Sequence, residues 1–424
     1  MHTLKTRLHF RAVAAAFVTL VAACGPAPEP TTAVVYEGAR LIVGDGSTIE
    51  NAVFTVDAGQ FVAVGAAEDV TVPDGAARVD LGGMTVMPAI VDAHVHLNTT
   101  REALIDDLER RAYFGVGAAM SMGSDISDTP LALRSELISG TARFRSAGSG
   151  ITRPEPGRRE VHWINTEEEA RRAMQEEAAR NVDLIKIWVD DRDGQYEKLT
   201  PELYGAVIDE AHANNLRVSA HIFTLEDAKG LLRAGVDIFA HGVRDQDIDD
   251  EFVEMIAERP GVVLIPNLPS RGVSTDLGWL EGAVPDDELA SLQAEGANPE
   301  AQASFDIQAR NLARLSEEGM TIAFGTDGNT PWAPHVEMED MVAAGMSPAD
   351  VIVAATRNAA EVMGLDGAGT VEAGKSADFV VLEANPLDDI TNTRRIASVY
   401  LRGEAVDRVG LRANWSTAEA AATQ

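Results

Sequence analysis

The chain has 424 residues, of which 45% are hydrophobic and 24% charged, so it can bury a large core and is not intrinsically disordered over most of its length. Asp and Glu number 67 against 35 Lys and Arg, which gives a formal net charge of −32. This balance argues against a nucleic-acid-binding protein, which needs a basic face. A single cysteine, Cys24, excludes an intramolecular disulfide and a zinc site built from cysteines.

The first part of the chain has the pattern of an export signal. Lys5, Arg7 and Arg11 precede an apolar run over residues 12–23, which is shorter than the roughly 20 residues that a membrane-spanning helix needs. Small residues stand directly before Cys24, as they do in the signals of bacterial lipoproteins. The alternative is an ordinary signal peptide that is cut near this point, with the cysteine incidental.

The expected processing follows from this pattern. We expect residues 1–23 to be a lipoprotein signal peptide, Cys24 to be lipidated, and the Pro-rich residues 24–32 to form a tether. The signal carries three basic residues and no acidic ones, so its removal changes the net charge to −32 − 3 = −35. The expected location is the membrane surface, where the lipid anchors a protein that faces the periplasm or the cell exterior.

Short β-like segments occupy both ends of the remaining chain. Residues 33–87 contain several alternating apolar bursts separated by Gly- and Asp-rich turns, and residues 377–382 and 396–403 have the same character. We expect residues 33–87 and 366–410 to build one small β-sandwich domain, and residues 411–424 to form a C-terminal tail.

Strand-like and helix-like segments alternate through residues 88–365. The expected strands cover residues 86–96, 115–122, 144–151, 184–189, 217–222, 238–243, 262–267 and 321–327, and the clearest helical patterns cover residues 166–181, 201–214, 224–234 and 299–318. This alternation predicts an α/β fold, specifically a (β/α)8 TIM-like barrel, with an open α/β sheet as the alternative. The polar, Gly- and Pro-containing residues 269–298 are expected to form a loop or lid.

Polar side chains that can bind metals end several of these strands. They are His94 and His96 on the first strand, Lys186 on the fourth, His221 on the fifth, His241 on the sixth and Asp327 on the eighth. Alternation along a strand places His94 and His96 on one face, and the strands of a barrel converge at its carboxyl end. A lysine inside the apolar run at 184–189 is costly to bury as an unpaired ammonium. One such histidine is usually structural, but the whole set favours a metal centre.

The order of these residues resembles the amidohydrolase superfamily, specifically its binuclear members with a carboxylated lysine in the imidazolonepropionase-like and prolidase-like branch. The matching pieces are the Asp-Ala-His-Val-His sequence at 92–96, Lys186, His221, His241, the Gly-Thr-Asp sequence at 325–327 and the run from 358 to 382.

The resemblance implies two divalent metal ions, by default zinc, with manganese, iron and cobalt as alternatives. It assigns His94, His96 and Asp327 to one metal, His221 and His241 to the other, and a carbon dioxide-derived carbamate on Lys186 to the bridge between them. It also implies catalysis by Asp327 and His241, with a metal-bridging hydroxide that attacks a carbonyl while Asp327 moves the proton to the leaving group.

The substrate is less sharply defined by the sequence. His162, Tyr196, Arg244 and His335 lie on expected loops after the strands and are candidate substrate contacts. The leading function is hydrolysis of a C–N amide bond in a dipeptide, an N-acyl amino acid or a cyclic amide. One alternative is a lactonase or esterase with the same centre, and another is a non-catalytic periplasmic ligand-binding lipoprotein.

Overall fold

The computed structural model describes residues 32–294 and 296–422, and the side chains as far as Trp415. The signal peptide, the Cys24 lipidation site and most of the tether therefore lie outside the described residues. Across the part of the chain that is described, no helix is both long enough and apolar enough to cross a membrane.

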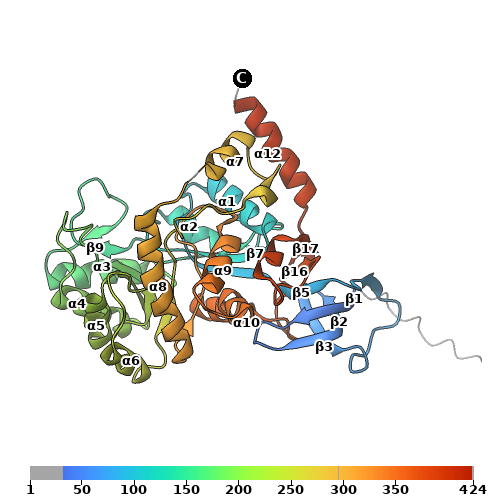
Figure 1. Ribbon diagram of the computed structural model, residues 1–424, viewed down its shortest axis with the longest axis horizontal. Helices are drawn as coiled ribbons and strands as arrows, with labels where there is room; N and C mark the ends of the chain where they lie inside the picture. Colours follow the sequence, from blue (N-terminus) through green and yellow to red (C-terminus); the bar gives the residue numbers. More distant parts are fainter. Residues whose placement is uncertain (1–31, 295, 423–424) are drawn as a thin grey trace, which may run out of the picture.

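Strands from both ends of the chain share one sheet. Its members are β1 (Val34–Ile42), β2 (Thr48–Asp57), β3 (Gln60–Ala66), β4 (Ala77–Asp80), β5 (Thr85–Pro88), β16 (Phe379–Leu382), β17 (Ile396–Leu401) and β18 (Glu404–Ala405). The order is β18-β17-β16-β5-β1-β2-β3, with β4 paired to β1. Figure 1 shows the blue strands β1, β2 and β3 beside β5, with the red β16 and β17 next in the sheet.

An aromatic cluster holds the two ends of the chain together in this sheet. The rings of Tyr36 and Phe54 stack with centroids 4.9 Å apart, and those of Phe379 and Tyr400 stack at 4.5 Å. Phe54 and Phe379 meet edge to face at 5.3 Å. Because Phe54 and Phe379 are fully buried, residues more than 300 positions apart in the chain stabilise the same small core.

A second set of strands runs parallel throughout. Three pair in the order β6 (Ile90–Val95), β7 (Val116–Ser121) and β8 (Arg143–Ser146), and seven pair in the order β10 (His162–Trp163), β9 (Ile151–Thr152), β11 (Ile185–Trp188), β12 (Val218–His221), β13 (Ile238–Ala240), β14 (Val263–Ile265) and β15 (Thr321–Ile322). Backbone hydrogen bonds also join β6 to the segment after β15, from Ala93 N to Phe324 O (2.9 Å) and from Thr326 N to His94 O (3.1 Å).

The expected single strand over residues 86–96 is two strands. β5 belongs to the small sheet, whereas β6 starts after only one further residue, Ala89, and pairs with β7. Ala89 N donates to Asp378 O (3.0 Å), so the residue between β5 and β6 is hydrogen-bonded to the residue directly before β16 of the small sheet. The run contains no glycine, but Pro88, the last residue of β5, stands at the change of sheet and could have indicated it.

Helices follow most of the parallel strands. They are α1 (Arg101–Tyr113), α2 (Asp128–Leu133), α3 (Glu167–Ala179), α4 (Pro201–Ala213), α5 (Leu225–Ala234), α6 (Asp250–Ala257), α8 (Pro299–Glu317), α9 (Ala333–Ala343), α10 (Pro348–Val353), the π-helical turn η2 (Ala354–Asn358) and α11 (Ala359–Val362), and a short 3₁₀ helix, η3 (Ile390–Arg394), follows β16. The start of α3 shows why a helix begins there: Thr166 Oγ1 accepts from Glu169 N, while Glu169 Oε2 accepts from Asn165 N (2.6 Å).

Two segments that were expected to be irregular contain helices. Residues 269–298 include η1 (Gly278–Leu280) and α7 (Asp286–Gln293), and the expected C-terminal tail is part of α12 (Arg408–Ala422), which lies near α7 in Figure 1. Leu280 and Trp415 are buried in one apolar cluster, and the Trp415 ring meets that of Tyr113 at 5.1 Å. Tertiary contacts that the local sequence does not reveal therefore stabilise both segments.

Candidate metal centre

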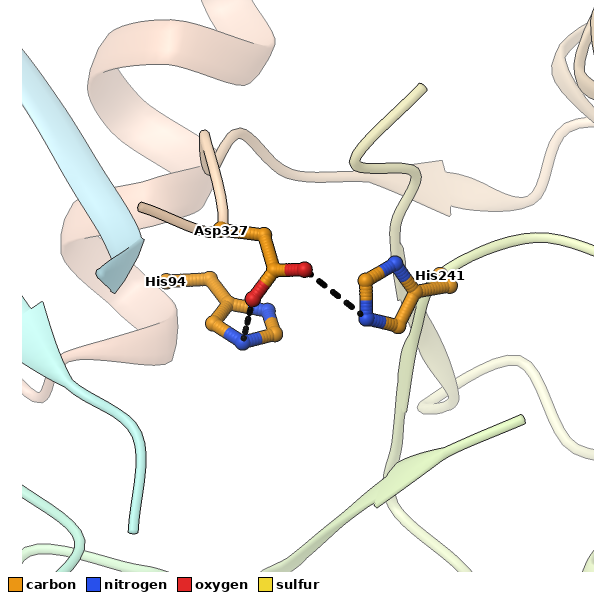
Figure 2. Close-up of side chains that lie close together, drawn as sticks. All are labelled: His94, His241 and Asp327. Carbon is orange, nitrogen blue, oxygen red and sulfur yellow. Dashed lines mark ion pairs between the residues drawn. The ribbon is translucent and has the colours of Figure 1, made fainter. Parts of the chain in front are cut away.

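Three histidines at the ends of two strands converge on one carboxylate. Nε2 of His94 and Nε2 of His96, at the end of β6, each lie 3.1 Å from Asp327 Oδ1. Nε2 of His241, directly after β13, lies 3.4 Å from Asp327 Oδ2. Figure 2 shows the carboxylate of Asp327 between the rings of His94 and His241, and these three residues offer ligand atoms within 4.8 Å of one another.

The backbone at these positions is held in an unusual conformation. His241 and Asp327 have φ angles of 76° and 53°, which only a few per cent of non-glycine residues adopt. Such angles cost about 1–3 kcal/mol each and cluster at functional sites. Close approach matters as well, because a Cβ at Gly325 would lie only 2.6 Å from the Cβ of His94. Glycine there lets the chain after β15 reach the first histidine.

Lys186 lies beside this group in a fully buried position on β11. Its Nζ is 3.3 Å from His94 Nε2 and 5.4 Å from the ring of Trp188, and among the described residues it forms no ion pair. Burial lowers the pKa of Lys186 to about 7, although the charge of Asp327 opposes that shift. Much of this amine is therefore neutral near physiological pH.

His221, at the end of β12, completes the group. Its ring lies 4.4 Å from that of His241, centroid to centroid, and its Nε2 is 3.3 Å from Asp190 Oδ2. That contact lacks hydrogen-bond geometry, so the buried Nε2 of His221 and both ring nitrogens of His241 have no hydrogen-bond partner among the described residues. Buried nitrogens without a partner are costly unless something binds them.

The protonation of the cluster fits a cation. Burial lowers the pKa of His94 to about 4 and lowers the pKa values of His221 and His241 well below their ordinary value of 6.5. Burial alone would raise the pKa of Asp327, but the neighbouring histidines, His94 first, lower it overall. Neutral imidazoles around an ionised carboxylate are the form that binds divalent metals, so the residues present fit such a centre.

Two supporting residues each hold one histidine of the first parallel strand but did not stand out in the sequence. Asn267, after β14, has a φ of 43°, and its Oδ1 lies 2.8 Å from Nδ1 of His94, which leaves Nε2 facing Asp327. The strand-end pattern could have indicated Asn267, because it closes the expected seventh strand. Ser124 Oγ lies 3.3 Å from Nδ1 of His96 in the same role.

A fully buried ion pair links helix α1 to strand β6, and its arginine also binds the chain after β15. Arg111 Nη1 lies 3.1 Å from Asp92 Oδ2, and Nη2 donates to Gly328 O (2.9 Å). Asp92 Oδ2 also accepts from Thr326 Oγ1 (2.8 Å). This network spans the chain on either side of Asp327 and so fixes its position relative to the first histidines.

We expect Arg111→Met to lower the free energy of unfolding by about 3–5 kcal/mol, because the carboxylate of Asp92 would stay buried without its cation. Urea unfolding measures this change. Arg101→Met is the matched control, since Arg101 and its partner Glu136 are exposed to solvent, and little change in the free energy of unfolding is expected. Equal stability of the two variants would contradict the structural role of Arg111.

The four candidate substrate contacts lie in different surroundings. His335 is buried in α9, and its two ring nitrogens face Phe114 O (2.9 Å) and Thr393 Oγ1 (3.1 Å), so it is placed as a structural residue and not with the centre. His162 likewise uses Nε2 on the buried carboxylate of Glu177, 2.7 Å away. The partners of His335 lie in distant segments of the chain, and that of His162 lies on the following helix, α3.

Arg244 borders the centre, whereas Tyr196 does not. A cleft of about 710 Å³ is lined by Asp190, Asp191, Arg192, Asp193, Gln195, His221, Phe223, Thr224, Arg244, Asp245, Ser304 and Asp327. Gln195 lines this cleft in the place where we expected Tyr196. The cleft gives a small molecule access to His221 and Asp327, which are both members of the cluster.

The geometry therefore defines a buried histidine–carboxylate–lysine centre, open to a cleft, of the kind that holds divalent metals in hydrolases. Comparison with known proteins agrees with this description. Residues 192–406 match the amidohydrolase family. The chain belongs to this family, and it is an amidohydrolase, an enzyme of the class that hydrolyses carbon–nitrogen bonds.

Individual relatives cover most of the chain. It is 25% identical to the imidazolonepropionase of Deinococcus radiodurans in an alignment of 399 positions that covers 85% of this chain and 93% of that protein. It is 24% identical to the ochratoxinase of Aspergillus niger in an alignment of 428 positions that covers 85% of this chain and 83% of that one. The crystal structure of a Xaa-Pro dipeptidase superposes with a TM-score of 0.71 at 22% identity, covering 88% and 99% of the two chains. These similarities show that the fold is that of the amidohydrolase superfamily.

Proposed function

We propose that this protein is an exported, metal-dependent hydrolase that cleaves the C–N bond of a small amide. The observation that carries the proposal is the group of His94, His221, His241 and Asp327, in which three buried ring nitrogens have no hydrogen-bond partner among the described residues, and of which His221 and Asp327 line a cleft. Relatives named for hydrolytic activities on small molecules support a small substrate. A dipeptide, an N-acyl amino acid or a cyclic amide fits this description.

The proposed ligands are those of the family pattern. His94, His96 and Asp327 would hold one metal ion and His221 and His241 a second, with zinc the first choice for imidazole and carboxylate ligands. When bound, two such ions supply an activated water and polarise a carbonyl group. His221 and Asp327 line the cleft, so the substrate would lie against them.

Lys186 is proposed to be carboxylated. Its buried, partly neutral amine can attack carbon dioxide, so that an N–C bond forms, one proton is released and an anionic carbamate remains. This product would remove the cost of a buried ammonium, and its oxygens would be suited to holding divalent metal ions. The 3.3 Å distance from Lys186 Nζ to His94 Nε2 supports this role.

Asp327 is the proposed acid–base residue. Its carboxylate touches the three histidines and also reaches the cleft, so it can accept a proton from an attacking water and donate it to the leaving nitrogen. His241 is proposed to hold its metal and to keep Asp327 oriented through the contact at 3.4 Å.

The closure of the barrel, the form of the small domain and the location of the protein are also part of this proposal. We propose that the parallel strands close into the eight-stranded barrel expected for residues 88–365, a closure that the hydrogen bonds between β6 and the chain after β15 support. The small domain would be a β-sandwich built from residues 33–87 and 366–410. A lipid on Cys24 would anchor the protein to the membrane, and mass spectrometry of the mature N-terminal peptide tests that modification.

A turnover screen of the zinc-loaded protein tests the function. It pairs dipeptides, N-acyl amino acids and cyclic amides with the matching esters or lactones, before and after removal of metal by a chelator. We expect amide hydrolysis that falls at least about 100-fold on chelation and returns with zinc. Turnover of esters or lactones alone would favour a lactonase or esterase, and substrate binding without any turnover would favour a binding lipoprotein.

A further inference from the structure

Arg244 lines the same cleft as His221 and Asp327. It follows β13 closely after His241, and its backbone N donates to Phe223 O (2.9 Å), which joins the loops after β12 and β13. Its guanidinium lies flat on the ring of Phe223, with Cζ 3.2 Å from the centroid. The Phe223 ring in turn lies 4.4 Å from that of His221 and 5.2 Å from that of His241. Arg244 is thus held one aromatic ring away from the proposed metal ligands.

The hydrogen-bond donors of Arg244 are not used within the described part of the protein. Its guanidinium forms no hydrogen bond and no ion pair there, although the residue is partly buried. Arg192, the other arginine that lines the cleft, is already paired with Asp190 (2.5 Å) and Glu155 (3.2 Å). Arg244 is therefore the cleft arginine with donors available to a ligand.

The physical chemistry of the position favours an anion. Burial lowers the pKa of Arg244, which reflects the cost of removing a cation from water, yet an arginine remains charged in proteins. Stacking on Phe223 fixes the plane of the guanidinium and leaves its edge free, and a carboxylate can accept two parallel hydrogen bonds from that edge. The side chains of Asp190 and Asp193 act on Arg244 through their charge but do not bond to it.

We propose that Arg244 is a specificity-determining residue that binds a carboxylate of the amide substrate, so that the preferred substrates are amides with a free carboxylate. This inference rests on the proposed function, because it names the substrate class for the same cleft. It separates dipeptides and N-acyl amino acids, which carry this group, from neutral cyclic amides and lactones. The competing interpretation is that Arg244 only braces Phe223 against the histidines.

The test compares the wild-type protein with Arg244→Met on a panel of dipeptides and N-acetyl amino acids, each paired with an analogue in which hydrogen replaces the carboxylate. We expect the variant to raise KM for the carboxylates by about 10- to 100-fold and to leave the analogues nearly unchanged. Arg244→Lys should keep part of the preference. Arg192→Met, which removes an equal charge from the same cleft, should affect both members of a pair alike.

The outcomes are distinguishable from failure of the proposed function. Equal effects of Arg244→Met on both members of each pair, or a wild-type protein with no preference for carboxylates, would overturn the role of Arg244. If the wild-type protein hydrolyses neither member of any pair, the proposed function fails. Calorimetry with the same N-acetyl amino acids then decides the inference alone: binding that Arg244→Met abolishes supports it, and absence of binding to the wild-type protein refutes it.

Discussion

Asp327→Asn is expected to lower kcat by roughly 10²- to 10⁴-fold, the range that a general acid–base residue contributes, while the protein remains folded. Asparagine has nearly the shape of aspartate but cannot carry a proton between a water molecule and a leaving group. The carboxylate of Asp327 also lies 3.1–3.4 Å from ring nitrogens of three histidines. The amide of asparagine keeps the shape but not the charge, so we expect the variant to retain much but not all of the bound metal.

The measurement combines steady-state kinetics with elemental analysis of the purified variant. Asp193→Asn is the matched control, because Asp193 lines the same cleft and also has a positive φ, 59°, that asparagine tolerates, but no side-chain hydrogen bond or ion pair involves it among the described residues. We expect only a small change in kcat for this control. Turnover close to that of the wild-type protein in Asp327→Asn would remove Asp327 from the acid–base role.

Lys186→Ala is expected to release the second metal ion and to lower turnover by more than about 100-fold, because the loss of a direct ligand should exceed the largest effect of losing an outer-shell partner of a metal site. The buried amine forms no ion pair among the described residues, and burial lowers its pKa to about 7, so a fraction near neutral pH can form the carbamate. Alanine has no nitrogen to carboxylate. A short carboxylic acid such as propionate can occupy the vacated space and should restore part of the activity.

Three readouts separate a ligand role from a structural one. Elemental analysis counts the metals, and a carbon-13 NMR signal from labelled carbon dioxide should appear in the wild-type protein and be absent from the variant. Lys186→Met keeps the volume of the side chain and should fold but show no rescue by propionate. Unchanged metal content in Lys186→Ala would rule out the bridging role, whatever happens to the rate.

The types and order of the strand-end residues could be predicted from the sequence because they depend on local periodicity. Alternation places His94 and His96 on one face, and parallel strands bring their carboxyl ends together, so the grouping with His241 and Asp327 follows from chain order alone. Lys186 was visible for a similar reason, since a lysine within an apolar strand has few structural uses.

Residues that support the centre were not predictable in the same way. Asn267 and Arg111 act through contacts with residues more than 100 positions away, at His94 and Gly328. The strand-end pattern could have indicated Asn267, but nothing in the local sequence indicates the contact of Arg111. The same holds for the helical segments that pack on Trp415, because the burial of Leu280 depends on where α12 lies. The local composition predicted irregular structure in these two segments because it does not show which surface each segment packs against.

The sequence by itself determined the family of this protein, its candidate metal-binding side chains and their order along the chain. The tertiary structure decided how the other polar residues are used. His162 and His335 contact partners on other elements, whereas within the described part of the protein the donors of Arg244 have no partner. The physical reason is that a side chain's availability depends on which groups satisfy its hydrogen bonds and charge, and long-range packing supplies those groups.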